Sequence, residues 1–122
     1  MILVDTSVWI DHFHKGIPSL AEALERQEVL SHPFVLGELA CGQLARRREV
    51  LDLLSDLPLT LVATDPEALH LIERHRLHGR GIGYIDVHLI ASVLLTEAAK
   101  LWTRDKGLAA IAARLGIDSG VR

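Results

Sequence analysis

The chain opens with a short apolar run that is followed directly by an acid. Residues 2–4 are all apolar and partly β-branched, which predicts a strand buried on both faces. Asp5 ends this run, and the spacing of apolar residues then becomes helical over residues 6–13. In open parallel α/β sheets, ligands bind at the carboxyl edge, where Asp5 would lie. Asp5 is equally suited to cap the helix that follows, so its position alone leaves both roles open.

The rest of the chain continues to alternate between short apolar runs and helical patterns. Further strands are expected at residues 29–30, 59–62 and 101–102, and Ile117 can begin a fifth. Helical patterns cover residues 19–27, 33–44, 46–54, 65–77, 84–99 and 106–115. Because there is no hairpin signal, repeat or linker, this alternation predicts one α/β domain over residues 1–122, with a mainly parallel sheet.

Composition adds expectations about partners and location. Apolar residues make up 49% of the chain and the mean hydropathy is +0.26, a surplus that favours a homodimer or another protein partner. The single cysteine, Cys41, excludes an intrachain disulfide and fits a reducing compartment. Asp5 interrupts the apolar start, so no secretory signal is expected, and residues 87–95 are too few to span a membrane. These features predict a cytoplasmic protein.

The formal net charge of −3 comes from 13 Lys and Arg against 16 Asp and Glu. This balance argues against a broad basic surface for nucleic acid. It does not exclude a nucleic-acid substrate, because cations bound to a few carboxylates would reverse the sign.

Three more acids stand at positions comparable to that of Asp5. Asp105 follows the expected strand at 101–102, just as Asp5 follows the first strand. Glu38 and Asp86 lie on helical segments whose other residues are mostly apolar. Each has an ordinary alternative: Glu38 as a solvated surface acid, Asp86 as an acid in a first helical turn, and Asp105 as a helix cap.

If these four carboxylates meet at one edge, they need either protons or cations. Two like charges 4 Å apart repel by about 4 kcal/mol at an effective dielectric constant near 20. A site built only from carboxylate oxygens favours hard cations such as Mg²⁺ or Mn²⁺. Such ions activate water and neutralise charge during phosphoryl transfer or phosphodiester cleavage.

Four short motifs in this chain resemble the motifs of PIN domains in order and spacing. They are Asp5-Thr6-Ser7, Pro33 through Glu38-Leu39 with Gly42, Tyr84 through Ala91, and Thr103-Arg104-Asp105. Together with the chain length, they resemble the VapC toxins of type II toxin–antitoxin pairs.

The resemblance implies a five-stranded parallel sheet flanked by helices and a Mg²⁺- or Mn²⁺-dependent endoribonuclease that acts on structured RNA such as tRNA or rRNA. By position, Asp5, Glu38, Asp86 and Asp105 would bind the metal, and Thr6 and Thr103 would be supporting hydroxyls. It also implies a homodimer and a cognate antitoxin whose tail enters the cleft. Many relatives carry Asp-Phe shortly after the last motif, where this chain has Gly107-Leu108, so a second metal position could be weak.

Two other functions stay open at this point. Asp5 could be the nucleophile of an aspartyl-phosphate phosphatase, although position 7 is Ser rather than the second Asp of that motif. Alternatively, the chain could be a non-catalytic module that binds RNA or protein. Zinc is not expected, because the histidines lack a third ligand at a suitable spacing, and Cys41 is expected to be a small packing residue.

Two arginine clusters are candidates for contact with RNA. Residues 74–80, with the sequence Arg-His-Arg-Leu-His-Gly-Arg, lie shortly before Asp86 and are the stronger candidate. Residues 46–48 are all arginine and fit a solvated helix face better.

Overall fold

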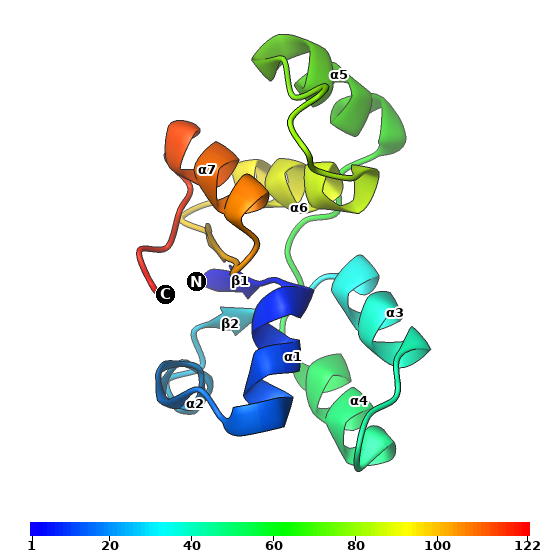
Figure 1. Cartoon of the computed structure of the whole chain (residues 1–122), viewed down its shortest axis with the longest axis vertical. Coiled ribbons are helices and arrows are strands. Elements are labelled where there is room, and N and C mark those ends of the chain that lie inside the picture. Colours follow the sequence, from blue (N-terminus) through cyan, green and yellow to red (C-terminus); the bar gives the residue numbers. More distant parts are fainter.

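The computed structural model describes all 122 residues as a small parallel sheet between helices. In chain order the elements are β1 (Ile2–Val4), α1 (Thr6–Lys15), α2 (Pro18–Glu25), β2 (Val29–Leu30), α3 (Pro33–Cys41), α4 (Arg47–Asp56), α5 (Asp65–His75), α6 (Tyr84–Leu95), β3 (Lys100–Trp102) and α7 (Lys106–Arg114). Figure 1 shows the sheet in the middle, with α6 and α7 on one side and α1, α2 and α4 on the other. This architecture confirms the predicted α/β class.

The first strand is the centre of the sheet. The order is β2-β1-β3, and both pairings are parallel. Leu3 pairs with Leu30 on one side and Leu101 on the other. Leu3 and Val4 are completely buried, because β1 has a neighbour on both edges and helices on both faces. Asp5, which follows β1, therefore lies in the middle of the carboxyl edge of the sheet.

Two of the expected strands are reduced to single parallel bridges, Ser31 with Leu59 and Leu101 with Asp118. The prediction of a strand over residues 59–62 is thus wrong beyond its first residue. The amide of Leu61 donates to Thr96 Oγ1, so a side chain from the end of α6 binds the backbone that a sheet neighbour would need. The sheet has three strands, extended at each outer edge by one bridge.

Helix α6 ends at Leu95, four residues before the predicted end. Thr96 caps it and donates its hydroxyl to the carbonyl of Ser92, and Ala98 then takes a left-handed conformation with φ of 58°. None of the helices has the combination of length and apolar character that crossing a membrane requires.

The core contains both tryptophans, Trp9 and Trp102. Cys41 was expected to be a packing residue, and this was wrong: it is exposed at the end of α3. Helix α5 packs on α6 and reaches the end of the molecule farthest from α4 (Figure 1). The loop after α5 returns the chain to α6, and this return brings Asp86 to the sheet edge.

Candidate active site

Asp5 lies at the carboxyl end of the central strand and is 6% exposed. It caps α1, since its Oδ1 accepts a hydrogen bond from the amide of Thr6 at 2.8 Å. Its Oδ2 accepts two more, from Ser7 Oγ at 2.8 Å and Thr103 Oγ1 at 2.7 Å. The cap role and the site role, which the sequence left as alternatives, are therefore compatible: one carboxylate is held rigidly by three donors.

Thr103 and Asp105 follow β3, the strand beside β1. The amide of Asp5 donates to the carbonyl of Trp102, which continues the β1–β3 pairing and places Thr103 next to Asp5. Thr103 Oγ1 also accepts the amide hydrogen of Asp105 at 3.1 Å. Asp105 caps α7 by accepting from the amide of Leu108, and only its Oδ1 is used. One buried hydroxyl thus fixes two acids relative to each other.

Glu38 reaches the same edge from α3, which packs against α1. Its Oε1 accepts a hydrogen bond from Thr6 Oγ1 at 2.8 Å, and its Oε2 has no partner in the protein. The residue is exposed, so it has room to move. The expectation that Thr6 supports an acid is consistent with this bond, which joins two segments 32 residues apart.

Asp86 is half-buried in the first turn of α6, and its Oδ2 accepts from the amide of Gly83 at 3.2 Å. Burial raises the pKa of its carboxyl above the ordinary value, and the charges of Asp5, Asp105 and Glu38 raise this pKa further. The Gly83 amide opposes these effects in part. The structure therefore brings all four predicted acids together, close enough for three of them to act on the fourth.

The donor set fits a hard divalent cation in chemistry, because it consists of carboxylate oxygens without nitrogen or sulfur. Glu38, Asp86 and Asp105 each keep one oxygen free of hydrogen bonds within the protein. No group of three or more His, Cys, Asp or Glu side chains lies close enough to hold a metal ion in this conformation. Binding a cation would therefore require side chains to move, which the exposed Glu38 and Asp105 have room to do.

Comparison with known proteins gives the family. The family model described as PIN domain matches residues 2–114, nearly the whole chain. This chain belongs to the PIN-domain family. The resemblance drawn from the four motifs is thereby confirmed.

Two named relatives of this PIN domain are very similar to it along almost their full length. The chain is 49% identical over 117 residues to the protein named Ribonuclease VapC32 of Mycobacterium tuberculosis (strain CDC 1551 / Oshkosh). The match covers 96% of this chain and 94% of the relative. The protein of the same name from strain ATCC 25618 / H37Rv gives identical values.

The site of this PIN domain contains two further residues, Ser7 and Arg104, to which the motifs alone assigned no role. Ser7 donates to Asp5 and accepts from the amide of Arg104 at 3.0 Å, so it connects the first and last motifs. Arg104 forms an ion pair with Asp11 of α1 at 3.0 Å. The position of Ser7 two residues after a site acid could have suggested its role. The pairing of Arg104 with Asp11, 93 residues apart, had no local signal.

Proposed function

We propose that this PIN domain is a divalent-cation-dependent endoribonuclease and the toxin of a toxin–antitoxin pair, with the whole chain acting as one nuclease domain in the cytoplasm. One observation supports this most strongly: four carboxylates from four separate segments converge at the carboxyl edge of the sheet, and three of them raise the pKa of the fourth. An RNA phosphodiester is the substrate that such a cluster and the named relatives both favour.

In this proposal Asp5, Glu38, Asp86 and Asp105 hold Mg²⁺ or Mn²⁺. When bound, the cation supplies a water of lowered pKa and neutralises charge that develops at phosphorus. Asp5 contributes a rigid carboxylate, since three donors prevent its rotation. The substrate is structured RNA of the tRNA or rRNA class, and the products carry a 5′ phosphate and a 3′ hydroxyl.

The two hydroxyls in the site have positioning roles. Thr103 orients Asp5 and the backbone of Asp105, and it is the only side chain that bonds to both. Thr6 orients Glu38. Neither hydroxyl needs to touch the substrate for its loss to disturb the acids.

An aspartyl-phosphate phosphatase is the weaker candidate. The second Asp of the phosphatase motif is absent, because position 7, two residues after Asp5, is Ser. A covalent phosphoenzyme at Asp5 would contradict this reasoning. The experiment below distinguishes the ribonuclease from a non-catalytic module that binds RNA or protein.

The proposal is tested with Asp86→Asn, which keeps the size of the side chain and removes its charge. Cleavage of unfractionated tRNA with Mg²⁺ or Mn²⁺ is expected to fall by at least about a hundredfold, because loss of even an outer-shell partner of a metal costs about 10- to 100-fold in activity. Asp52→Asn is the matched control, because Asp52 is an exposed acid on α4. Thermal melting by circular dichroism verifies that both variants fold. Equal cleavage by both variants would show that the acidic edge is not the active site, and RNA binding without any cleavage would favour a binding module.

A groove beside the acids supports the proposed antitoxin partner. It has a volume of about 970 Å³, lies between α1, α3 and α4, and includes Glu38. Ile10 and Leu53, each 44% exposed, belong to its lining. An amphipathic antitoxin segment in this groove would cover its apolar wall and block access to Glu38. Protection of α1 and α4 amides from hydrogen exchange upon addition of the antitoxin would support this, and unchanged exchange would contradict it.

The proposed homodimer would use a different apolar surface, at the junction of α5 and α6. Leu94 and Leu95 are 45% and 42% exposed and line a hollow with Pro66 and Leu71. Burying this surface would account for the high apolar content of the chain. Sedimentation equilibrium measures the mass directly, and a single-protomer mass at all concentrations would exclude the dimer.

A further inference from the structure

Four arginines gather around the C-terminal end of α5, at the end of the molecule remote from α4. Arg74 lies in the last turn of α5, and Arg76 follows it in a left-handed conformation with φ of 52°. Arg80 donates its Nε hydrogen to the carbonyl of Arg76 at 3.2 Å. Arg114, from the end of α7, donates to the carbonyl of His75 at 2.6 Å. Arg74, Arg76, Arg80 and Arg114 are called the arginine cluster below.

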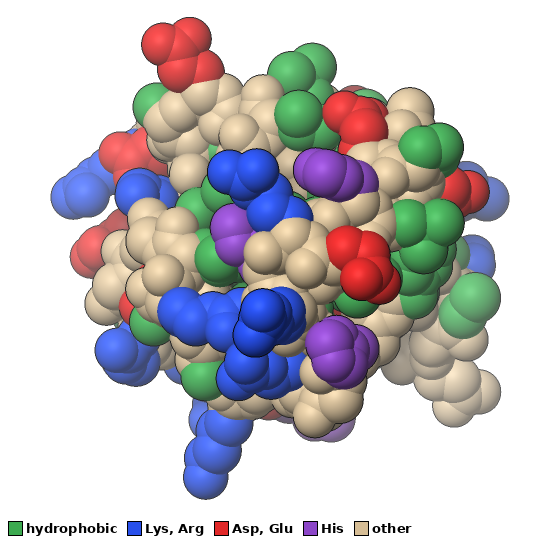
Figure 2. All heavy atoms as spheres, turned by 90° about the horizontal axis from the view of Figure 1, so that it is seen from above, with side chains coloured by type: hydrophobic (Ala, Val, Ile, Leu, Met, Phe, Trp, Pro, Cys, Tyr) green, Lys and Arg blue, Asp and Glu red, His purple; other side chains and the backbone are tan.

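The positive charges of the arginine cluster are not neutralised by neighbouring carboxylates. All four side chains are exposed, and none forms an ion pair with a carboxylate within 4.0 Å. Figure 2, which looks onto this end of the molecule, shows basic side chains gathered on it together with histidines. Cations near a helix C-terminus are ordinarily explained by the helix dipole. However, the two backbone bonds occupy one donor each, and a guanidinium has five. Most of the donors therefore face solvent.

The loop that carries Arg80 adjoins the acidic edge. A Cβ placed at Gly107, in the first turn of α7, would lie 3.7 Å from the carbonyl oxygens of Arg80 and Gly81. The same Cβ would lie 3.4 Å from Asp105 Oδ1. The loop thus packs on the residues next to one site acid, and it leads within six residues to another, Asp86. The backbone at Arg80, at one edge of the arginine cluster, therefore lies beside the acidic edge.

We propose that the arginine cluster binds backbone phosphates of the RNA substrate several nucleotides away from the cleaved bond. This inference rests on the proposed ribonuclease function and deepens it. A site of four carboxylates on a chain of net charge −3 repels RNA, so affinity must come from cations elsewhere. Guanidinium groups match phosphate through paired donors, which makes arginine suited to this role. Recognition of this kind follows the backbone rather than base sequence.

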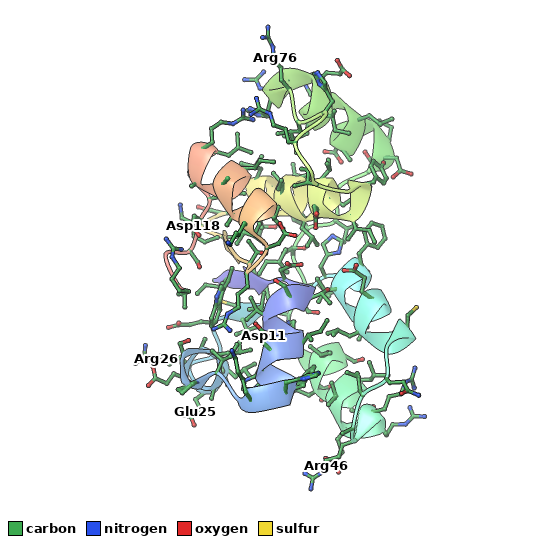
Figure 3. The ribbon with its side chains drawn as sticks, in the orientation of Figure 1. Asp11, Glu25, Arg26, Arg46, Arg76 and Asp118 are labelled. Carbon is green, nitrogen blue, oxygen red and sulfur yellow. The ribbon has the colours of Figure 1, made fainter.

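The experiment compares two triple variants that remove the same charge. Arg74→Gln, Arg76→Gln and Arg80→Gln alter the cluster. Arg46→Gln, Arg47→Gln and Arg48→Gln alter three exposed arginines at the opposite end of the molecule, as the positions of Arg76 and Arg46 in Figure 3 show. Binding of unfractionated tRNA is measured against salt concentration in an Asp86→Asn background, where cleavage does not interfere. Each lost phosphate contact lowers the slope by about 0.7 to 0.9, so the cluster variant should flatten it by about 2 to 3.

Cleavage by the otherwise wild-type enzyme gives a second readout. The cluster variant should raise KM for tRNA by about tenfold or more, with little change in kcat, because phosphates away from the cleaved bond add uniform binding. Cleavage of a trinucleotide, too short to span both sites, should not change. Replacing the same three arginines with lysine should restore most of the salt slope, since charge is kept. The control triple should behave as wild type in every assay.

Equal losses in the two triples, or an unchanged salt slope in the cluster variant, would overturn the proposal. A different result would contradict the ribonuclease proposal. If the wild-type protein binds RNA through the cluster but does not cleave it, the phosphate-binding surface stands and the nuclease does not. If the wild-type protein cleaves RNA and the cluster variant cleaves it equally well, the ribonuclease proposal stands and the phosphate-binding surface does not.

Discussion

A buried histidine controls the start of the helix that carries Glu38. His32 is completely buried and caps α3: its Nδ1 accepts the amide hydrogen of Phe34 at 3.0 Å. The proton of the neutral ring therefore lies on Nε2, which is 3.0 Å from Ser92 Oγ. A proton added to Nδ1 would face the Phe34 amide hydrogen and break the cap. Burial accordingly lowers the pKa of His32 from 6.5 to about 4, and the neighbouring His88 contributes to this shift.

This lowered pKa makes stability depend on pH in a defined direction. The unfolded chain takes up a proton at His32 near pH 6.5, whereas the folded protein resists it until about pH 4. Acid therefore favours the unfolded state, and stability is lost as the pH falls through this window. Protonation of His32 should lower the free energy of unfolding by about 2 kcal/mol between pH 7 and pH 5. Below the pKa of the folded state, the total loss from this group reaches roughly 3 kcal/mol.

The assay is urea unfolding at pH 7, 6 and 5, followed by the fluorescence of the buried Trp9 and Trp102. His32→Asn keeps an oxygen that can cap α3 and removes the titrating ring. This variant should be less stable at pH 7, because the contact with Ser92 is lost, but its stability should fall by about 2 kcal/mol less than wild type on going to pH 5. His14→Asn, at an exposed position, is the control. Equal pH dependence in wild type and His32→Asn would refute the reasoning.

Two further predictions concern hydroxyls that bond to acids. Thr103→Val removes the donor to Asp5 and the acceptor for the Asp105 amide, so urea unfolding should show a loss of about 1–3 kcal/mol and single-turnover cleavage should slow by at least about tenfold. The pKa of Asp65 is lowered chiefly by the Tyr84 hydroxyl, so Tyr84→Phe should raise this pKa toward its ordinary value in a carboxyl NMR titration. An unchanged unfolding free energy in the first variant, or an unchanged titration in the second, would contradict these bonds.

Local pattern was enough to predict the elements whose neighbours in sequence decide their structure. The buried strand at residues 2–4 and the helix that begins at Asp65 are examples, because apolar periodicity and helix-start signals act over a few residues. The same local logic identified Asp5 and Asp105 as acids that follow strands. It also identified Glu38 and Asp86, although a single acid on a helix has an equally good ordinary explanation.

Local sequence pattern did not predict features that depend on residues far apart along the chain. Residues 59–62 have the composition of a strand, but Thr96 binds the amide of Leu61, and only one bridge to Ser31 forms. Local pattern likewise gave Ser7 no role and gave Arg104 no partner, since their bonds join the two ends of the chain.

The sequence alone determined the kinds of element and their parallel arrangement, because these follow from side-chain type and short-range spacing. The tertiary structure decided which groups meet. It placed β1 between β2 and β3, so that Asp5 comes within reach of Thr103, and it folded the α5–α6 loop onto α7, so that the backbone at Arg80 lies beside Asp105. The physical reason is that the interaction energies of such pairs depend on distances in space, and separation along the chain does not specify those distances.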